Sequence, residues 1–232
     1  MKSEIKFCLG EITNSLSSYE ELIADNLAAY DLFELWLDYV TKIDLSELKS
    51  LLEKYPGQLL LLTRRRNQET LTLDSALRRE IIDLAREHDC IVDLDYTEQR
   101  EDLDYFLFQS GSGPSDCKLL ISYHNYSATP AADELAKLLS EMSEMPAEYY
   151  KLACVCQSQA DVLRLLHLYQ EEQGKLEQLI VLGAGEHGML SRVAALLWQQ
   201  PIIYAPRSKE EFIVPGQLTR QQYKDLSAVF KS

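Results

Sequence analysis

The 232-residue sequence is short of positive charge and of long apolar runs, and each shortage argues against a class of protein. Its 23 lysines and arginines stand against 37 acidic residues, which gives a formal net charge of -14. Nucleic acid and anionic membranes both need a basic protein surface, so neither is expected as a main partner. No apolar run approaches the length of a membrane span, and residues 1–6 lack the apolar region of a signal peptide. An anionic substrate would therefore need a locally basic pocket.

The sequence also lacks a cysteine pattern that would indicate disulfides or zinc. Its five cysteines are an odd number, and most stand in apolar segments: Cys8, Cys90, Cys117, Cys154 and Cys156. Cys154 and Cys156 are too close together for the usual zinc pair and have no second pair nearby. We therefore predict reduced, buried thiols in a cytoplasmic protein.

Short apolar segments alternate with amphipathic segments along the whole chain. The predicted strands span residues 5–9, 32–37, 58–63, 90–94, 118–123, 149–154, 179–183 and 201–204. The predicted helices span residues 19–27, 45–54, 73–88, 98–108, 131–142, 159–170, 189–198 and 219–230. Eight such repeats, with no linker or low-complexity tract between them, predict an α/β protein with a (β/α)8 TIM barrel as a single domain over residues 1–232.

Two polar residues interrupt neighbouring strands of this pattern. Lys151 lies within one predicted strand, and His124 ends the strand before it. A lysine in a buried strand is unfavourable unless it is paired, neutral or chemically employed. Together the two residues indicate an amine nucleophile beside an acid/base imidazole. Structural roles remain open for both: a hydrogen-bonded core histidine, and a lysine that is paired with a carboxylate or points to the outside of the barrel.

Further polar residues follow the other strands, where barrels of this class carry their chemistry. They are Glu34, Asp38, Arg64, Arg65, Arg66, Glu69, Asp93, Asp95, Arg192 and Gln217. Three successive arginines often form a solvated turn, and the two aspartates after the fourth strand have a simple reading as salt-bridge partners for them. Residues 183–188 (GAGEHG) resemble a phosphate loop only weakly, so a nucleotide site is not expected.

In order and spacing, these segments resemble type I 3-dehydroquinate dehydratase over nearly the whole chain. The motifs that carry the resemblance are residues 33–39 (FELWLDY), 62–65 (LTRR) with Glu69, 122–126 (SYHNY) with 129–130 (TP), 151–153 (KLA), 185–192 (GEHGMLSR) and 215–217 (PGQ). The resemblance implies the dehydration of 3-dehydroquinate to 3-dehydroshikimate in the shikimate pathway. It implies that Lys151 forms an imine with the C3 ketone, that His124 acts as base and then as acid, and that Glu69 orients His124.

The resemblance also implies how the substrate, a small anionic hydroxy-ketone, is held. Arg192 would bind its carboxylate through a bidentate fork. Arg65 would lie near the ring hydroxyls, and Glu34 and Gln217 would bind them. The loop of residues 205–218 would carry Gln217 and close over the substrate. Neither a metal nor an organic cofactor is required. Apolar helix faces are compatible with a homodimer, but the sequence does not determine the oligomeric state.

Three positions depart from the family pattern. Trp36 stands where the family has an arginine, Ile213 where it has a serine, and Thr70-Leu71 where it has a glycine pair. We therefore expect a divergent dehydratase with a weaker affinity or an altered substrate, in which Trp36→Arg should lower KM. Two other readings remain: a different lysine-imine barrel enzyme, such as a small-sugar aldolase, and a non-catalytic barrel that binds an anionic ligand or a partner protein.

Overall fold

The strands and helices alternate as the sequence predicts. The computed structural model describes residues 4–64, 73–109, 116–176, 178–211 and 214–231. Within these ranges eight β-strands alternate with eight α-helices, and the sheet has the order β7-β6-β5-β4-β3-β2-β1-β8. The pairs β1–β8, β2–β3, β3–β4 and β6–β7 are parallel. The predicted α/β class with a (β/α)8 TIM-barrel topology is confirmed.

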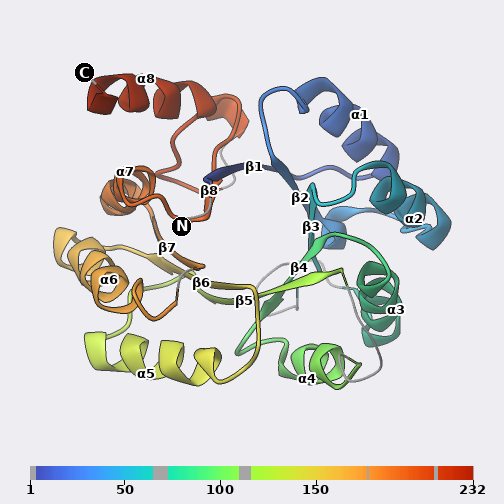
Figure 1. Cartoon of the computed structure of the whole chain (residues 1–232), viewed down its shortest axis with the longest axis horizontal. Helices are drawn as coiled ribbons and strands as arrows, with labels where there is room; N and C mark the ends of the chain where they lie inside the picture. The colour runs from blue at the N-terminus through green and yellow to red at the C-terminus, as the bar shows by residue number, and fades with distance from the viewer. Residues whose placement is uncertain (1–3, 65–72, 110–115, 177, 212–213, 232) are drawn as a thin grey trace. The chain divides into compact units, whose positions relative to one another are not determined.

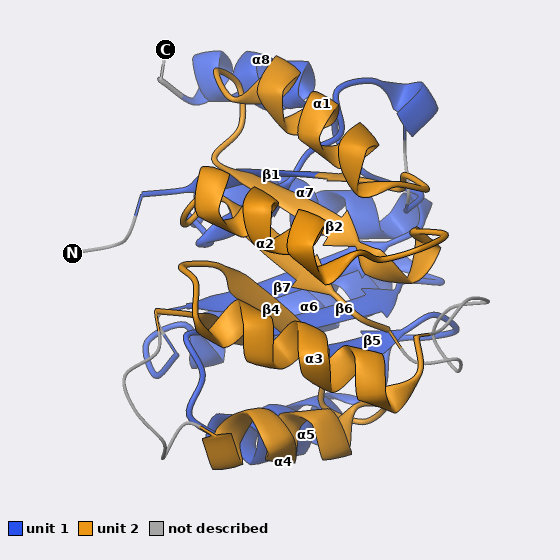
Figure 2. Cartoon of the chain, turned by 90° about the vertical axis from the view of Figure 1, so that its right-hand side faces the viewer, with its two compact units in different colours: residues 1–9, 122–232 blue, residues 10–121 orange. Residues whose placement is uncertain are grey.

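The chain forms two compact units (Figure 2). Unit 1 contains residues 1–9 and 122–232, and unit 2 contains residues 10–121. Two strands contribute residues to both units: β1 (Lys6–Glu11) and β5 (Lys118–Asn125). The single domain over residues 1–232 stays a prediction.

In unit 2, helices cover one face of the strands β2 to β4 (Figure 1). Its elements are α1 (Leu16–Asn26), β2 (Leu32–Trp36), the 3-10 turn η1 (Leu37–Tyr39), α2 (Leu45–Lys54), β3 (Leu59–Leu62), α3 (Ser75–Arg86), β4 (Ile91–Asp95) and α4 (Arg100–Gln109). Every residue of β2, β3 and β4 is buried. This explains their apolar runs, since strands of a parallel sheet are buried on both faces.

Unit 1 repeats the alternation from β5 to the C-terminal helix. Its elements are α5 (Ala132–Ser143), β6 (Tyr149–Val155), α6 (Gln159–Glu172), β7 (Leu179–Ala184), the 3-10 turn η3 (Glu186–Gly188), α7 (Met189–Leu197), β8 (Ile202–Tyr204), the 3-10 turn η4 (Lys209–Glu211) and α8 (Arg220–Lys231). β6 pairs with β7 along its length, with Lys151 opposite Ile180. The first strand pairs with the last through Phe7 and Ile203.

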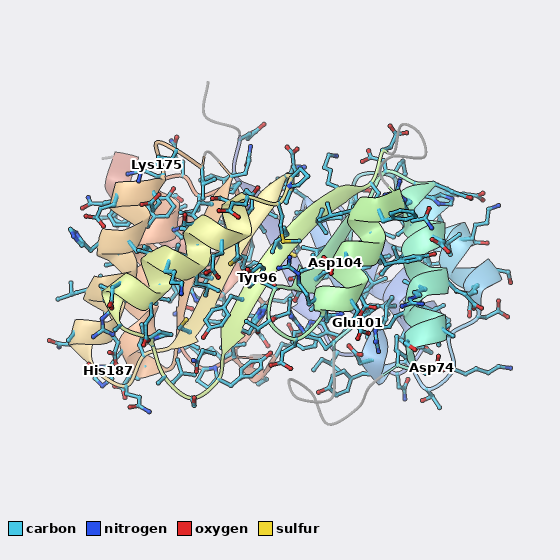
Figure 3. All side chains as sticks on the ribbon, turned by 90° about the horizontal axis from the view of Figure 1, so that it is seen from below. Asp74, Tyr96, Glu101, Asp104, Lys175 and His187 are labelled. Carbon is cyan, nitrogen blue, oxygen red and sulfur yellow. The ribbon has the colours of Figure 1, made fainter. Side chains whose placement is uncertain are left out.

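Helix caps account for two of the differences from the predicted boundaries. The first helix begins at Leu16 rather than residue 19, because the side chain of Ser15 accepts a hydrogen bond from the backbone N–H of Ser18. The third helix begins at Ser75 rather than residue 73, because the carboxylate of Asp74 accepts from the first-turn N–H groups. Asp74 is exposed, as are Glu101 and Asp104 on α4, and Figure 3 shows these acidic side chains on the outside of the helices.

The cysteines agree with the prediction of reduced, mostly buried thiols. All five cysteines are free thiols; four are buried, and Cys117 is half-buried. The thiol of Cys90 hydrogen-bonds to that of Cys117, with 3.7 Å between the two Sγ atoms. Among the described residues, no helix combines the length and hydropathy that a membrane crossing requires.

Candidate active site

Lys151 lies inside unit 1, on the third residue of β6. Its side chain is 4% exposed, so a position in solvent is excluded. The Nζ atom lies 4.6 Å from the centre of the Tyr204 ring, at the end of β8. An aromatic face attracts an ammonium group and gives it a defined position in an apolar surrounding. The lysine is therefore held at one place in the interior.

His124 lies on the strand next to Lys151 in the sheet order. It is the seventh residue of β5 and is half-buried. Its ring stacks on Tyr126, with 6.0 Å between centroids and an interplanar angle of 26°. The thiol of Cys154 hydrogen-bonds to the backbone of Asn125, so the ends of β5 and β6 lie side by side. The structure thus brings the predicted imidazole and the predicted amine to neighbouring strands.

Arg192, in the first turn of α7, is a buried cation. It is 4% exposed, and its Nε donates to the carbonyl of Gly183 at 3.3 Å. Burial lowers the pKa of its guanidinium, and the nearby Tyr223 and Tyr204 oppose that shift. No carboxylate of a described residue forms an ion pair with it. Because an uncompensated buried charge is unfavourable, the position is suited to bind an external anion.

The loop after β7 places Arg192 through its glycines. A Cβ on Gly183 would lie 2.7 Å from the Cα of Gly188, so the two backbones approach as only glycine allows. The Ser191 hydroxyl accepts from Gly183 N and donates to Gly188 O, both at 2.7 Å. These glycines therefore pack the chain on itself, which explains their weak likeness to a phosphate loop. His187, in the same loop, is exposed and lies at the surface in Figure 3.

Gln217 is held by the loop that follows β8. It is 9% exposed, and its Oε1 accepts from the backbone N–H of Val214 at 3.2 Å. Gly216 has φ +85°, and a Cβ there would lie 2.2 Å from the carbonyl oxygen of Gly185. Gly185 N also donates to the carbonyl of Pro215 at 2.9 Å. The C-terminal end of this loop is thus attached to the loop after β7, in the same unit as Arg192.

In unit 2, Glu34 and Trp36 form a buried pair on β2. They are 5% and 8% exposed, and the indole Nε1 donates to Glu34 Oε2 at 2.9 Å. The side chains are two residues apart on the strand and point to the same face. The tryptophan therefore contacts the predicted hydroxyl-binding carboxylate directly.

Arg64 is buried rather than part of a solvated turn. It is 2% exposed, and its Nη2 lies 3.6 Å from Asp93 Oδ2, so the salt-bridge reading of Asp93 is confirmed. The Arg64 backbone N donates to Asp38 Oδ2 at 2.8 Å. Asp95 Oδ1 accepts from the backbone N–H groups of Thr97 and Glu98 in the turn after β4, and its salt bridge to an arginine stays a prediction. A run of arginines carries no signal for which member is buried.

Several predicted positions lie outside the described residues: Arg65, Arg66, Glu69, Thr70, Leu71 and Ile213. The predictions for these residues remain as the resemblance states them. Sequence reasoning missed Tyr204 and Tyr223, which lie beside Lys151 and Arg192. Both segments have the apolar pattern of ordinary packing. The available signal in the sequence was the aromatic residue Tyr204 at the end of β8, the last strand of the repeat.

Comparison with known proteins identifies the family. A family model described as Type I 3-dehydroquinase matches residues 11–231. The 3-dehydroquinate dehydratase of Streptococcus pyogenes serotype M5 is 27% identical over 223 residues, 92% of this chain and 93% of that protein. That of Dehalococcoides mccartyi is 33% identical over 105 residues, 45% of this chain and 46% of that protein. The chain spans only 32% to 59% of the length of several curated relatives that it matches.

A solved structure agrees on the fold. The 3-dehydroquinate dehydratase from Aquifex aeolicus VF5 has a TM-score of 0.78 and 23% identity, over 97% of this chain and 99% of that chain. At this identity the likeness concerns the fold alone. The family model, in contrast, spans nearly the whole sequence, and the strands of Lys151 and His124 lie within its range. The chain belongs to the type I 3-dehydroquinase family.

Proposed function

We propose that this protein dehydrates 3-dehydroquinate to 3-dehydroshikimate through an imine on Lys151, as a hydro-lyase of the shikimate pathway. The observation that carries the proposal is the burial of Lys151 on β6 with its amine over the Tyr204 ring. A structural barrel has no need for a lysine there, because burial of an amine is unfavourable. A nucleophile, in contrast, benefits from a desolvated and fixed amine.

The reaction begins when the neutral amine of Lys151 attacks the C3 ketone and water is released. The imine draws electrons from the neighbouring carbon, so His124 can remove the C2 proton and form an enamine. The enamine then expels the C1 hydroxyl, which leaves as water with a proton returned by His124. Hydrolysis of the product imine regenerates Lys151. In this scheme Glu69 orients the imidazole of His124.

Substrate binding is assigned to four further residues. Arg192 binds the carboxylate, since it is a buried guanidinium without a carboxylate partner among the described residues. Glu34, Arg65 and Gln217 bind ring hydroxyls. Gln217 is supported by the attachment of its loop to Gly185, which holds the residue in place. The chemistry needs no metal and no organic cofactor.

The cellular location and the assembly are proposed from the composition and from exposed side chains. Free cysteines and the acidic composition support a cytoplasmic location. The exposed apolar side chains Leu190 and Leu197, which are 49% and 52% exposed on α7, support a homodimer.

The test is intact mass after incubation with 3-dehydroquinate and borohydride, which reduces an imine to a stable amine. The native chain should gain one substrate-sized adduct, and Lys151→Ala should gain none. Lys175→Ala is the matched control, because Lys175 is an exposed lysine of the same unit bonded to Glu172. Absence of an adduct on the native chain, together with no absorbance from an enone product, would rule out the proposal. An adduct without enone product would favour another lysine-imine enzyme.

A further inference from the structure

Trp36 connects a buried carboxylate to a buried guanidinium. On one side its indole Nε1 donates to Glu34 Oε2 at 2.9 Å. On the other side the guanidinium carbon of Arg64 lies 5.6 Å from the centre of the indole ring. All three side chains are at most 8% exposed, so bulk water does not replace either contact. The contacts lie within unit 2 and join β2 to the residues that follow β3.

The indole is itself held by its neighbours. The backbone N–H of Trp36 donates to the hydroxyl of Tyr19 at 2.9 Å, and the indole ring meets the Tyr39 ring edge-on at 6.2 Å between centroids. The terminal torsion of a glutamate is soft, so a free carboxylate samples many orientations. A short N–H···O⁻ bond from a fixed indole removes that freedom. Trp36 therefore helps to fix the plane in which Glu34 presents its oxygens.

Arg64 supplies the positive charge beside this pair. Its Nη2 lies 3.6 Å from Asp93, and its backbone is tied to Asp38 at 2.8 Å. A guanidinium over an indole face gains from the ring quadrupole when both are desolvated. The resemblance places one arginine side chain at position 36, which would supply both a donor and a positive charge. In this protein Trp36 supplies the donor, and Arg64 beside it supplies the charge.

We propose that Trp36 is a positioning residue that orients Glu34 toward a ring hydroxyl of the substrate, with Arg64 packed on its ring as the accompanying cation. The inference rests on the proposed dehydratase function, in which Glu34 accepts a hydrogen bond from a ring hydroxyl of the substrate. It also reverses the expectation for Trp36→Arg. That change removes the indole donor and places a second guanidinium beside Arg64, so KM should rise rather than fall.

The test separates the N–H group from the ring. Trp36→Phe keeps an aromatic ring under Arg64 but loses the N–H donor and part of the ring volume. KM for 3-dehydroquinate should rise about tenfold with kcat within about twofold, because a bond made equally in ground and transition states affects binding alone. Trp198→Phe is the matched control, since Trp198 is the second tryptophan and stacks on Tyr169 in unit 1 at 5.2 Å. An unchanged KM in Trp36→Phe, or a fall of KM in Trp36→Arg, overturns the inference.

A second readout does not depend on turnover. The two indole N–H resonances in a ¹H–¹⁵N spectrum are assigned with Trp36→Phe and Trp198→Phe. Glu34→Gln should shift the resonance of Trp36 and leave that of Trp198 in place. If the native chain neither turns over 3-dehydroquinate nor forms the borohydride adduct, the proposed function fails. The positioning role is then decided by this spectrum, and an unmoved Trp36 resonance overturns it.

Discussion

The two units bury charges in different ways. Among the described residues, the buried charged side chains of unit 1 are the cations Lys151 and Arg192. Those of unit 2 are five carboxylates and two arginines: Glu34, Asp38, Asp93, Asp95, Asp102, Arg64 and Arg78. One unit therefore buries only positive charge, and the other buries an excess of negative charge.

Buried charges of unit 2 have charged or polar partners within the protein itself. Arg78 Nε bonds to Asp102 Oδ2 at 2.8 Å between α3 and α4, and Arg64 lies against Asp93. Asp95 accepts from the N–H groups of its own turn. Breaking such a contact destabilises a fold because it leaves a buried ion without its partner.

The charges of unit 1 are arranged differently. Arg192 donates to one carbonyl, and Lys151 lies over the ring of Tyr204. A single carbonyl only partly compensates the buried guanidinium of Arg192. The difference teaches that a buried ion with a charged protein partner indicates architecture, whereas a buried guanidinium such as that of Arg192, with no carboxylate partner among the described residues, indicates a site for an external anion.

The largest effect should come from breaking an ion pair of unit 2. Arg78→Met leaves the carboxylate of Asp102, which is 1% exposed, buried without its guanidinium. The free energy of unfolding should fall by about 3–5 kcal/mol, measured by urea denaturation. Arg100→Met is the control, because its pair with Asp104 is exposed and should contribute less than about 1 kcal/mol. Equal losses in both variants would contradict the structural role of the Arg78 pair.

The corresponding change in unit 1 should affect binding instead of stability. Arg192→Met removes a buried cation that has no carboxylate partner among the described residues, so the free energy of unfolding should stay level or rise. KM for 3-dehydroquinate should rise about 30- to 100-fold, as loss of a buried charge partner of a ligand predicts. Steady-state kinetics and urea denaturation of the same preparation measure both. A large loss of stability with an unchanged KM would show that Arg192 serves the fold, as the buried charges of unit 2 do, and would contradict the proposed difference between the units.

The smallest effect is an alkaline loss of stability shared by both units. Burial raises the pKa of Tyr19 in unit 2 and of Tyr223 in unit 1 from 10.0 to about 12 each. The folded chain then keeps these protons longer than the unfolded chain does. The stabilisation is complete below pH 10 and decreases as the pH rises toward 12.

Phenylalanine variants isolate this effect. Between pH 8 and pH 11, Tyr19→Phe and Tyr223→Phe should each lose about 1 kcal/mol less free energy of unfolding than the native chain. Urea denaturation at the two pH values gives the difference. Identical pH dependence in the native chain and both variants would show that neither hydroxyl ionises differently in the folded state.

The alternation of strands and helices could be predicted from the sequence because it depends on local periodicity. A few residues are enough to recognise a fully buried strand such as β3, with four leucines, or an amphipathic helix such as α2. The neighbouring positions of His124 and Lys151 follow from the same repeat, since consecutive strands of such a fold pair with each other. The departure at Trp36 was visible for the same reason, as a single letter within a recognisable motif.

Only the tertiary structure decided which polar residues work together. Arg64 is buried against Trp36 and Asp93, Arg192 lies beside Tyr204 and Tyr223, and Gly216 meets Gly185. These contacts join residues far apart in the chain, and each depends on side-chain directions at the ends of different strands. Periodicity determines which residues a strand contains, but the partner of a buried charge is determined by what the fold brings within a few ångströms of it, because charge interactions depend on distance and burial rather than on order in the sequence.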